Sequence, residues 1–112
     1  MSPEQLKNIS LEALEDLKGI NIQVFDVRGM SSVTDFMIIA TGSSDRQVKA
    51  LANSVIVKSK ENGCMPIGVE GQHPGNWILV DLADVVVHIM TPDMREFYQL
   101  EKLWNTDAEV AS

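Results

Sequence analysis

Residues 77–90 read WILVDLADVVVHIM, and this stretch is the most informative about the fold because it contains two apolar runs separated by a tight turn. Side chains of a β-strand point alternately to its two faces, which places Ile78 and every second residue after it on one face. On the other face of the same run, Asp81 indicates contact with water. The stretch therefore predicts two strands, at 77–82 and 84–90, in a sheet with one buried and one solvated face.

The solvated face of these strands is predicted to carry an apolar surface. Trp77 and Leu79 share the side of the first strand that bears the carboxylate. On the second strand, the polar His88 indicates that its own side, which also carries Met90, is the less buried one. A tryptophan among apolar residues and carboxylates is typical of an interface core with a polar rim, and Tyr98 extends this surface. The alternative is that another segment covers the face and makes Trp77 a core residue.

The segments on either side of these strands predict a regular alternation of helices and strands. Ser2, Pro3 and Gln5 have the pattern of a capped helix start, and Gly19 ends that helix. The other predicted elements are strands at 22–27, 36–41 and 66–69, a helix capped by Ser43 or Ser44 and ended by Gly63, and a helix opened by Thr91 and Pro92. This order predicts a single α/β domain with a mixed five-stranded sheet and three main helices largely on one face, leaving part of the other face uncovered.

Length and composition agree with one domain. The 112 residues allow one hydrophobic core, with the domain at 1–105 and a flexible tail at 106–112. No apolar run reaches the roughly 20 residues needed to span a bilayer, which predicts no membrane association. The N-terminus lacks the pattern of a secretory signal, and the single cysteine, Cys64, cannot form an internal disulfide. These features predict a cytoplasmic protein.

The charge balance favours a protein partner over a nucleic acid. Nine Lys and Arg residues against sixteen Asp and Glu residues give a formal net charge of −7. Phosphate backbones are on average repelled by such a chain, so little direct nucleic-acid contact is expected. A basic protein partner would instead be attracted, because complementary charge steers the encounter of two proteins.

The turn at 41–45, Thr-Gly-Ser-Ser-Asp, lies between a predicted strand and a helix N-terminus, where backbone amides can hold a phosphate. Nucleotidyltransferases follow such a turn, about ten residues on, with a strand that bears two metal-binding carboxylates. The matching stretch here, 52–56, contains none, so metal-assisted phosphoryl transfer lacks its ligands. The turn is better explained as a helix cap.

The remaining candidates for chemistry do not form a recognisable site. Glu70, Asp81 and Asp84 lie near strand ends, but their spacing matches no ligand signature. His73, expected in a turn, and His88, expected on a strand, have no zinc-ligand pattern around them, and Cys64 has no identifiable base. The sequence thus predicts no catalytic residue, no metal and no cofactor.

Several segments together resemble the iojap-like family of ribosomal silencing factors. They are DVR at 26–28, TDF to ATGS at 34–43, VEG at 69–71, WILVD to DVVVH at 77–88, and REFYQLEKLW at 95–104. Each is weak alone, but they cover nearly the whole chain in order and at family-like spacing. The resemblance implies a nucleotidyltransferase-like fold without the catalytic carboxylates, and a protein that is not an enzyme.

The resemblance also implies a partner and a mode of action. Members of the family bind a basic large-subunit ribosomal protein, the one numbered fourteen, at the subunit-joining face. They thereby block joining of the small subunit sterically and repress translation when nutrients are scarce. Two alternatives remain: a nucleotide-binding protein that uses Gly42 and Ser43, and a module that forms a homodimer through the face of Trp77.

Combined with the strand faces, the resemblance implies a set of partner-binding residues. Trp77 and Tyr98 are expected to be aromatic anchors, with Leu79, His88 and Met90 as their neighbours. The carboxylates expected to meet Lys or Arg on the ribosomal protein are Asp81, Asp84 and Glu101.

Overall fold

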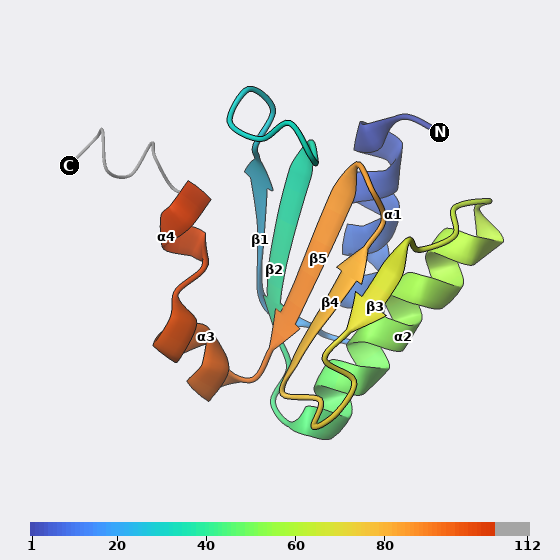
Figure 1. Cartoon of the computed structure of the whole chain (residues 1–112). Helices are drawn as coiled ribbons and strands as arrows, with labels where there is room; N and C mark the ends of the chain where they lie inside the picture. The colour runs from blue at the N-terminus through green and yellow to red at the C-terminus, as the bar shows by residue number, and fades with distance from the viewer. Residues whose placement is uncertain (105–112) are drawn as a thin grey trace.

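The computed structural model describes residues 1–104, and its centre is one five-stranded sheet with the strand order β1-β2-β5-β4-β3 (Figure 1). The predicted tail at 106–112 lies outside the described residues. The strands are β1 (Ile20–Asp26), β2 (Phe36–Thr41), β3 (Gly68–Glu70), β4 (Trp77–Asp81) and β5 (Val85–Met90), and the helices are α1 (Pro3–Asp16), α2 (Asp45–Glu61), α3 (Pro92–Tyr98) and α4 (Glu101–Trp104). The prediction of a single α/β domain with a mixed sheet is confirmed, because β2 pairs with β5 in parallel while the other pairs are antiparallel.

The helix starts follow from local capping chemistry. The Ser2 hydroxyl accepts a hydrogen bond from the Gln5 amide, and the Gln5 side chain accepts one from the Ser2 amide, which completes a capping box before α1. Before α2, the Ser44 hydroxyl accepts from the amide of Gln47, so Ser44 is the N-cap and not Ser43. Both caps satisfy backbone donors that have no partner within the helix.

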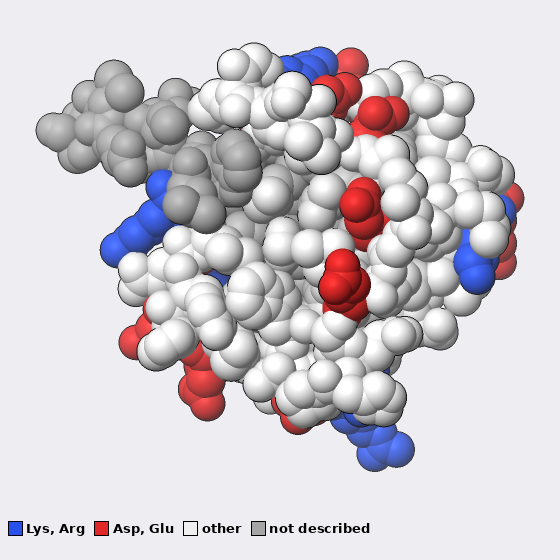
Figure 2. Space-filling model, viewed as in Figure 1, with Lys and Arg blue, Asp and Glu red and all other residues white. Residues whose placement is uncertain are grey.

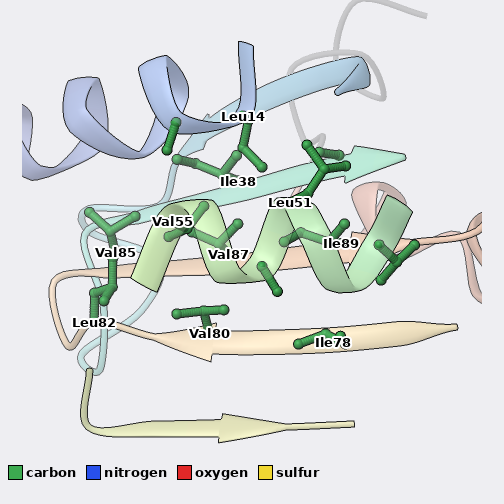
Figure 3. Packing of buried hydrophobic residues seen from close by; sticks show 14 of the residues in the cluster. Leu14, Ile38, Leu51, Val55, Ile78, Val80, Leu82, Val85, Val87 and Ile89 are labelled. Atoms are coloured by element: carbon green, nitrogen blue, oxygen red, sulfur yellow. The ribbon is translucent and has the colours of Figure 1, made fainter. Parts of the chain in front are cut away.

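The two long helices cover one face of the sheet and enclose the main core. Figure 1 shows α1 and α2 side by side on that face, and Figure 3 shows Leu51 and Val55 of α2 packed against side chains of the sheet. Lys58 of α2 forms ion pairs with Glu12 and Asp16 of α1 and so joins the two helices. Every residue of β2 is buried, as expected for a central strand covered on both sides.

The third helix departs from the expected arrangement. α3 lies on the opposite face from α1 and α2, where Met94 and Leu100 pack against a second cluster that includes Met37, Ile39 and Met90. The helical run ends at Tyr98, because Gln99 adopts a left-handed conformation with φ 50° before α4 begins. Among the described residues, Met94 and Leu100 thus cover that face over Met37, Ile39 and Met90, whereas Leu79 and Val86 of the same face stay half-buried. We call the sheet side opposite α1 and α2 the open face.

The short edge strand is displaced from its predicted position. The expected strand at 66–69 is observed at Gly68–Glu70, since Pro66 has no amide to donate and Ile67 makes only a single bond to the Asp81 carbonyl. Within residues 1–104, no helix is long and apolar enough to cross a bilayer.

Candidate binding surface on the open face

The strand register determines which side chains share the open face. Glu70 lies beside Leu79, Leu79 beside His88, and His88 beside Ile39 in one row across four strands. The next row runs from Asp81 through Val86 to Met37. The prediction that Leu79 and Asp81 share one face of β4, opposite Ile78, is confirmed by the burial of β4, where Ile78 and Val80 are buried and the alternate residues are partly exposed.

The open face combines half-buried apolar side chains with carboxylates. Leu79 and Val86 are half-buried at its centre, and Glu70 is exposed at the edge. In Figure 2, acidic side chains lie among uncharged ones over the strands, whereas basic side chains lie toward the outline of the molecule. This distribution matches an apolar patch with an acidic rim.

The most distinctive feature of this surface is a group of three aromatic rings, which we call the aromatic cluster: Trp77, Phe97 and Tyr98. The ring centroids of Trp77 and Tyr98 are 4.7 Å apart, and those of Phe97 and Tyr98 are 5.0 Å apart in an edge-to-face arrangement. Tyr98 is 47% exposed and Phe97 is 78% exposed. Trp77 is half-buried at the base of the cluster and packs beside the second core cluster.

Phe97 is not among the residues that the sequence predicts for this surface, although its neighbour Tyr98 is. The available signal was its position in the predicted last helix, one residue before Tyr98. Phe97 is 78% exposed and its ring lies against that of Tyr98, so it extends the exposed aromatic surface beyond Tyr98.

The expected exposure of His88 and Met90 is wrong. Met90 has 0% exposed surface and His88 has 7%. Met90 belongs to the cluster against which Met94 of α3 packs, and His88 is hydrogen-bonded to the half-buried Trp77. Burial also lowers the pKa of His88 to about 4, so its ring is neutral at neutral pH. Neither side chain is available as a direct contact of the kind predicted.

Glu101 is already engaged within the chain. Its Oε2 atom accepts a hydrogen bond from Nε of the buried Arg95 at 2.9 Å. The same guanidinium donates to the carbonyl of Asn21 at 2.6 Å and to the hydroxyl of Thr41 at 2.9 Å. Glu101 therefore joins α4 to Arg95 within the chain, and the expected contact of Glu101 with a Lys or Arg of a partner stays a prediction. Nothing in the local sequence around Arg95 signals this network.

The other two predicted carboxylates lie at one end of the open face. Asp84 is exposed in the turn between β4 and β5. Asp81 is half-exposed, and its Oδ1 atom accepts a hydrogen bond from the Ala83 amide at 2.8 Å, which closes the turn. The backbone amide of Asp35 donates a hydrogen bond to the Asp84 carbonyl. These carboxylates form the acidic rim nearest to Leu79 and Val86.

The turn at 41–45 is occupied by its own hydrogen bonds. The Gly42 amide donates to the Met90 carbonyl, and the Ser43 amide donates to the side chain of Gln47 at 2.6 Å. With Ser44 capping α2, these donors stabilise the strand and helix ends. The stretch 52–56, compared above with a carboxylate-bearing strand, lies inside α2 and not on a strand.

The remaining candidates lie apart from one another. His73 is exposed in the turn before β4, as predicted, and Cys64 packs against the main core after α2. Within the described part of the chain, no three His, Cys, Asp or Glu side chains lie close enough to hold a metal ion.

The comparisons with known proteins agree with the fold and the sequence pattern. Over residues 1–112 the chain matches the family described as "Ribosomal silencing factor during starvation". It is 50% identical, over 93% of its length and 85% of the relative's, to the ribosomal silencing factor RsfS of Chromobacterium violaceum. It is 54% identical to the RsfS of Haemophilus influenzae, over 84% of this chain and 92% of that protein.

A solved structure matches as well. The crystal structure of a Chromobacterium violaceum protein that is 50% identical has a TM-score of 0.92, and the match covers 94% of this chain and 88% of that chain. The predicted resemblance is thus confirmed, and the chain belongs to the family of ribosomal silencing factors, which are not enzymes.

Proposed function

We propose that this chain binds a basic protein of the large ribosomal subunit, the one numbered fourteen, at the face where the small subunit joins. The bound chain blocks subunit joining sterically, in the cytoplasm, and so represses translation under nutrient limitation. Family membership supports association with the ribosome. The observation that carries the finer proposal is the exposed aromatic cluster beside an acidic rim on the open face.

The aromatic cluster has the properties of an energetic centre in an interface. Trp and Tyr are enriched among the few residues that carry most of the binding free energy, and they act when a partner buries them. Tyr98 and Phe97 have surface to bury, and Trp77 beneath them is supported by core contacts. Leu79 adds half-buried apolar area next to them.

The acidic rim suits the charge of the proposed partner. Asp81, Asp84 and Glu70 lie along the half-buried apolar patch, and the whole chain carries a formal net charge of −7. Lys and Arg side chains at the edge of a partner would meet these carboxylates, whereas ribosomal RNA would be repelled by them. The rim therefore favours protein contact over RNA contact at the same location.

The blocking action requires only stable occupancy. A folded body of 12.4 kDa at the joining face occupies space that the small subunit needs, and no covalent bond is made or broken. Affinity and residence time then determine the extent of repression. Because affinity depends on a few anchors, single substitutions in the aromatic cluster should have large effects.

Affinity measurements on isolated large subunits test this proposal. We expect Trp77→Ala and Tyr98→Ala each to weaken binding by about 2 kcal/mol, roughly thirtyfold in Kd, with the fold retained. The matched control is Val57→Ala, which truncates an exposed side chain of α2, away from the open face. Unchanged affinity in both aromatic variants, or an equal loss in the Val57 variant, would remove the aromatic cluster from the interface.

A further inference from the structure

The indole nitrogen of Trp77 has a specific partner inside the chain. Its Nε1–H group donates a hydrogen bond to Nδ1 of His88 at 3.0 Å, and the two ring centroids are 5.9 Å apart with a tilt of 46°. Trp77 is at one end of β4 and His88 is near the middle of β5, the strand that pairs with it. The bond therefore connects a surface side chain to the centre of the sheet.

His88 is held in a way that suits an acceptor. Its side chain is 7% exposed, on a strand paired on both sides. For Nδ1 to accept, the ring must be neutral and carry its proton on Nε2. The lowered pKa of His88, caused by burial, keeps the ring neutral at neutral pH.

Tyr98 braces the other part of the same indole. Its ring centroid lies 4.7 Å from that of Trp77, at an interplanar angle of 49°. Trp77 is thus fixed by a hydrogen bond at its nitrogen and by ring contact with α3. A half-buried tryptophan with two such supports has fewer rotamers to lose when a partner covers it, and lower ordering cost raises affinity.

We propose that His88 is a positioning residue that holds the Trp77 indole in its binding orientation through the Nδ1 hydrogen bond. This role rests on the proposed function, because it assigns Trp77 to the interface. Because His88 is buried, it cannot contact a partner directly, and it acts on binding only through its hydrogen bond with Trp77. Loss of the acceptor frees the indole and leaves its donor unpaired, so that binding weakens although no contact residue has changed.

Three variants separate the hydrogen bond from the bulk of the histidine ring. His88→Asn places an amide oxygen close to the Nδ1 position and retains the acceptor, whereas His88→Leu fills similar space without one. Trp77→Phe keeps an aromatic ring and removes the donor.

The first readout is the Trp77 indole N–H signal in nitrogen–proton correlation NMR, assigned by its absence in Trp77→Phe. The second is the dissociation rate from isolated large subunits.

The expected results form a consistent set. In His88→Leu the indole signal should move and exchange faster with water, and dissociation should be roughly tenfold faster. The dissociation rate of His88→Asn should stay within about threefold of that of the unsubstituted chain, since the hydrogen bond to the Trp77 indole is retained. The double variant Trp77→Phe with His88→Leu should dissociate no faster than Trp77→Phe alone, because both changes remove the same bond.

Other results would overturn the positioning role. If the indole signal moves in His88→Leu but the dissociation rate does not change, the hydrogen bond between Trp77 and His88 is irrelevant to binding. Whether Trp77 lies in the interface is tested separately, by Trp77→Ala. Additive losses in the double variant would assign His88 an independent effect. If His88→Leu fails to fold, Trp77→Phe decides: tight binding without the donor contradicts the proposal. Failure of the unsubstituted chain to bind large subunits would instead overturn the proposed function, and this role with it.

Discussion

At the scale of single residues, Arg95 joins parts of the chain that are distant in sequence. Its guanidinium donates to the Asn21 carbonyl and the Gln23 side chain of β1, to Thr41 at the end of β2, and to Glu101 of α4. A buried cation is tolerated when its donors are matched by acceptors in this way. Arg95 therefore holds α3, and with it the aromatic cluster, against the open face.

The first residue-scale prediction concerns this network. Arg95→Met should lower the free energy of unfolding by about 3 kcal/mol, because Glu101 loses its cationic partner and three other acceptors lose a donor. The control is Arg46→Met, at an exposed position in the first turn of α2, which should change the free energy of unfolding by about 0.5 kcal/mol or less. Urea unfolding measures both, and equal stabilities of the two variants would contradict the importance of the network.

The second residue-scale prediction concerns pH. The pKa of His88 falls from its ordinary value of 6.5 to about 4 in the folded chain, because burial disfavours the charged ring. Between these two values the unfolded chain binds the proton and the folded chain does not, so stability falls as pH decreases from 6.5 toward 4. The full effect is roughly 3 kcal/mol, and it is absent above the unfolded pKa.

The control for this pH dependence is His88→Asn, which cannot titrate. Its free energy of unfolding should change less across the same window, as measured by urea unfolding at a series of pH values. The pKa of Asp26 is lowered from 3.8 to about 2, chiefly by its hydrogen bonds with Arg28. The contribution of Asp26 to the stability of the fold is therefore lost only as the pH falls from 3.8 toward 2, below the window of His88. An identical slope in His88→Asn and the unsubstituted chain would show that other groups cause the acid sensitivity.

At the scale of elements, the sequence predicts most of what local chemistry determines. The capping box of α1, the cap of α2 and the alternation of β4 all depend on neighbours within a few residues, and the structure confirms them. The burial of His88 is not predictable from its polarity, because its Nδ1 atom accepts a hydrogen bond from Trp77 and so needs no contact with solvent. The network of Arg95 is not predictable from neighbouring residues, because its acceptors on β1 lie more than seventy positions away.

The element-scale prediction concerns the connection between β3 and β4. Gly71 has a φ of +89°, and a Cβ atom there would lie 1.9 Å from the Trp77 carbonyl oxygen. Gly71→Ala should therefore combine backbone strain with displacement of the Trp77 strand end, and cost about 3 kcal/mol or more. The same change should weaken binding to large subunits, since Trp77 moves.

Gly29→Ala is the matched control for this substitution. Gly29 has a φ of +88°, but no atom lies within 4 Å of an added Cβ, so only the strain remains, at about 1 kcal/mol. Thermal unfolding and binding to large subunits should be measured for both variants. Equal loss of stability, or normal binding by Gly71→Ala, would show that the close approach at Trp77 has no effect.

At the scale of the whole molecule, the net charge of −7 should act on the rate of encounter. Raising salt from low to physiological concentration should slow association with the large subunit more than it speeds dissociation, because salt screens long-range attraction. Asp81→Asn combined with Asp84→Asn should reduce both the association rate and its salt dependence. Stopped-flow mixing measures these rates, and a salt-independent association rate would contradict electrostatic steering.

If occupancy of the large subunit is enough to prevent joining, a subunit-joining assay will show it. Purified large and small subunits are mixed at physiological salt, with the chain or with Trp77→Ala, and joined ribosomes are separated from free subunits by sedimentation. We expect the chain to cosediment with free large subunits and joining to fail, while Trp77→Ala permits joining at the same concentration. Normal joining with the chain bound to the large subunit would contradict the steric mechanism.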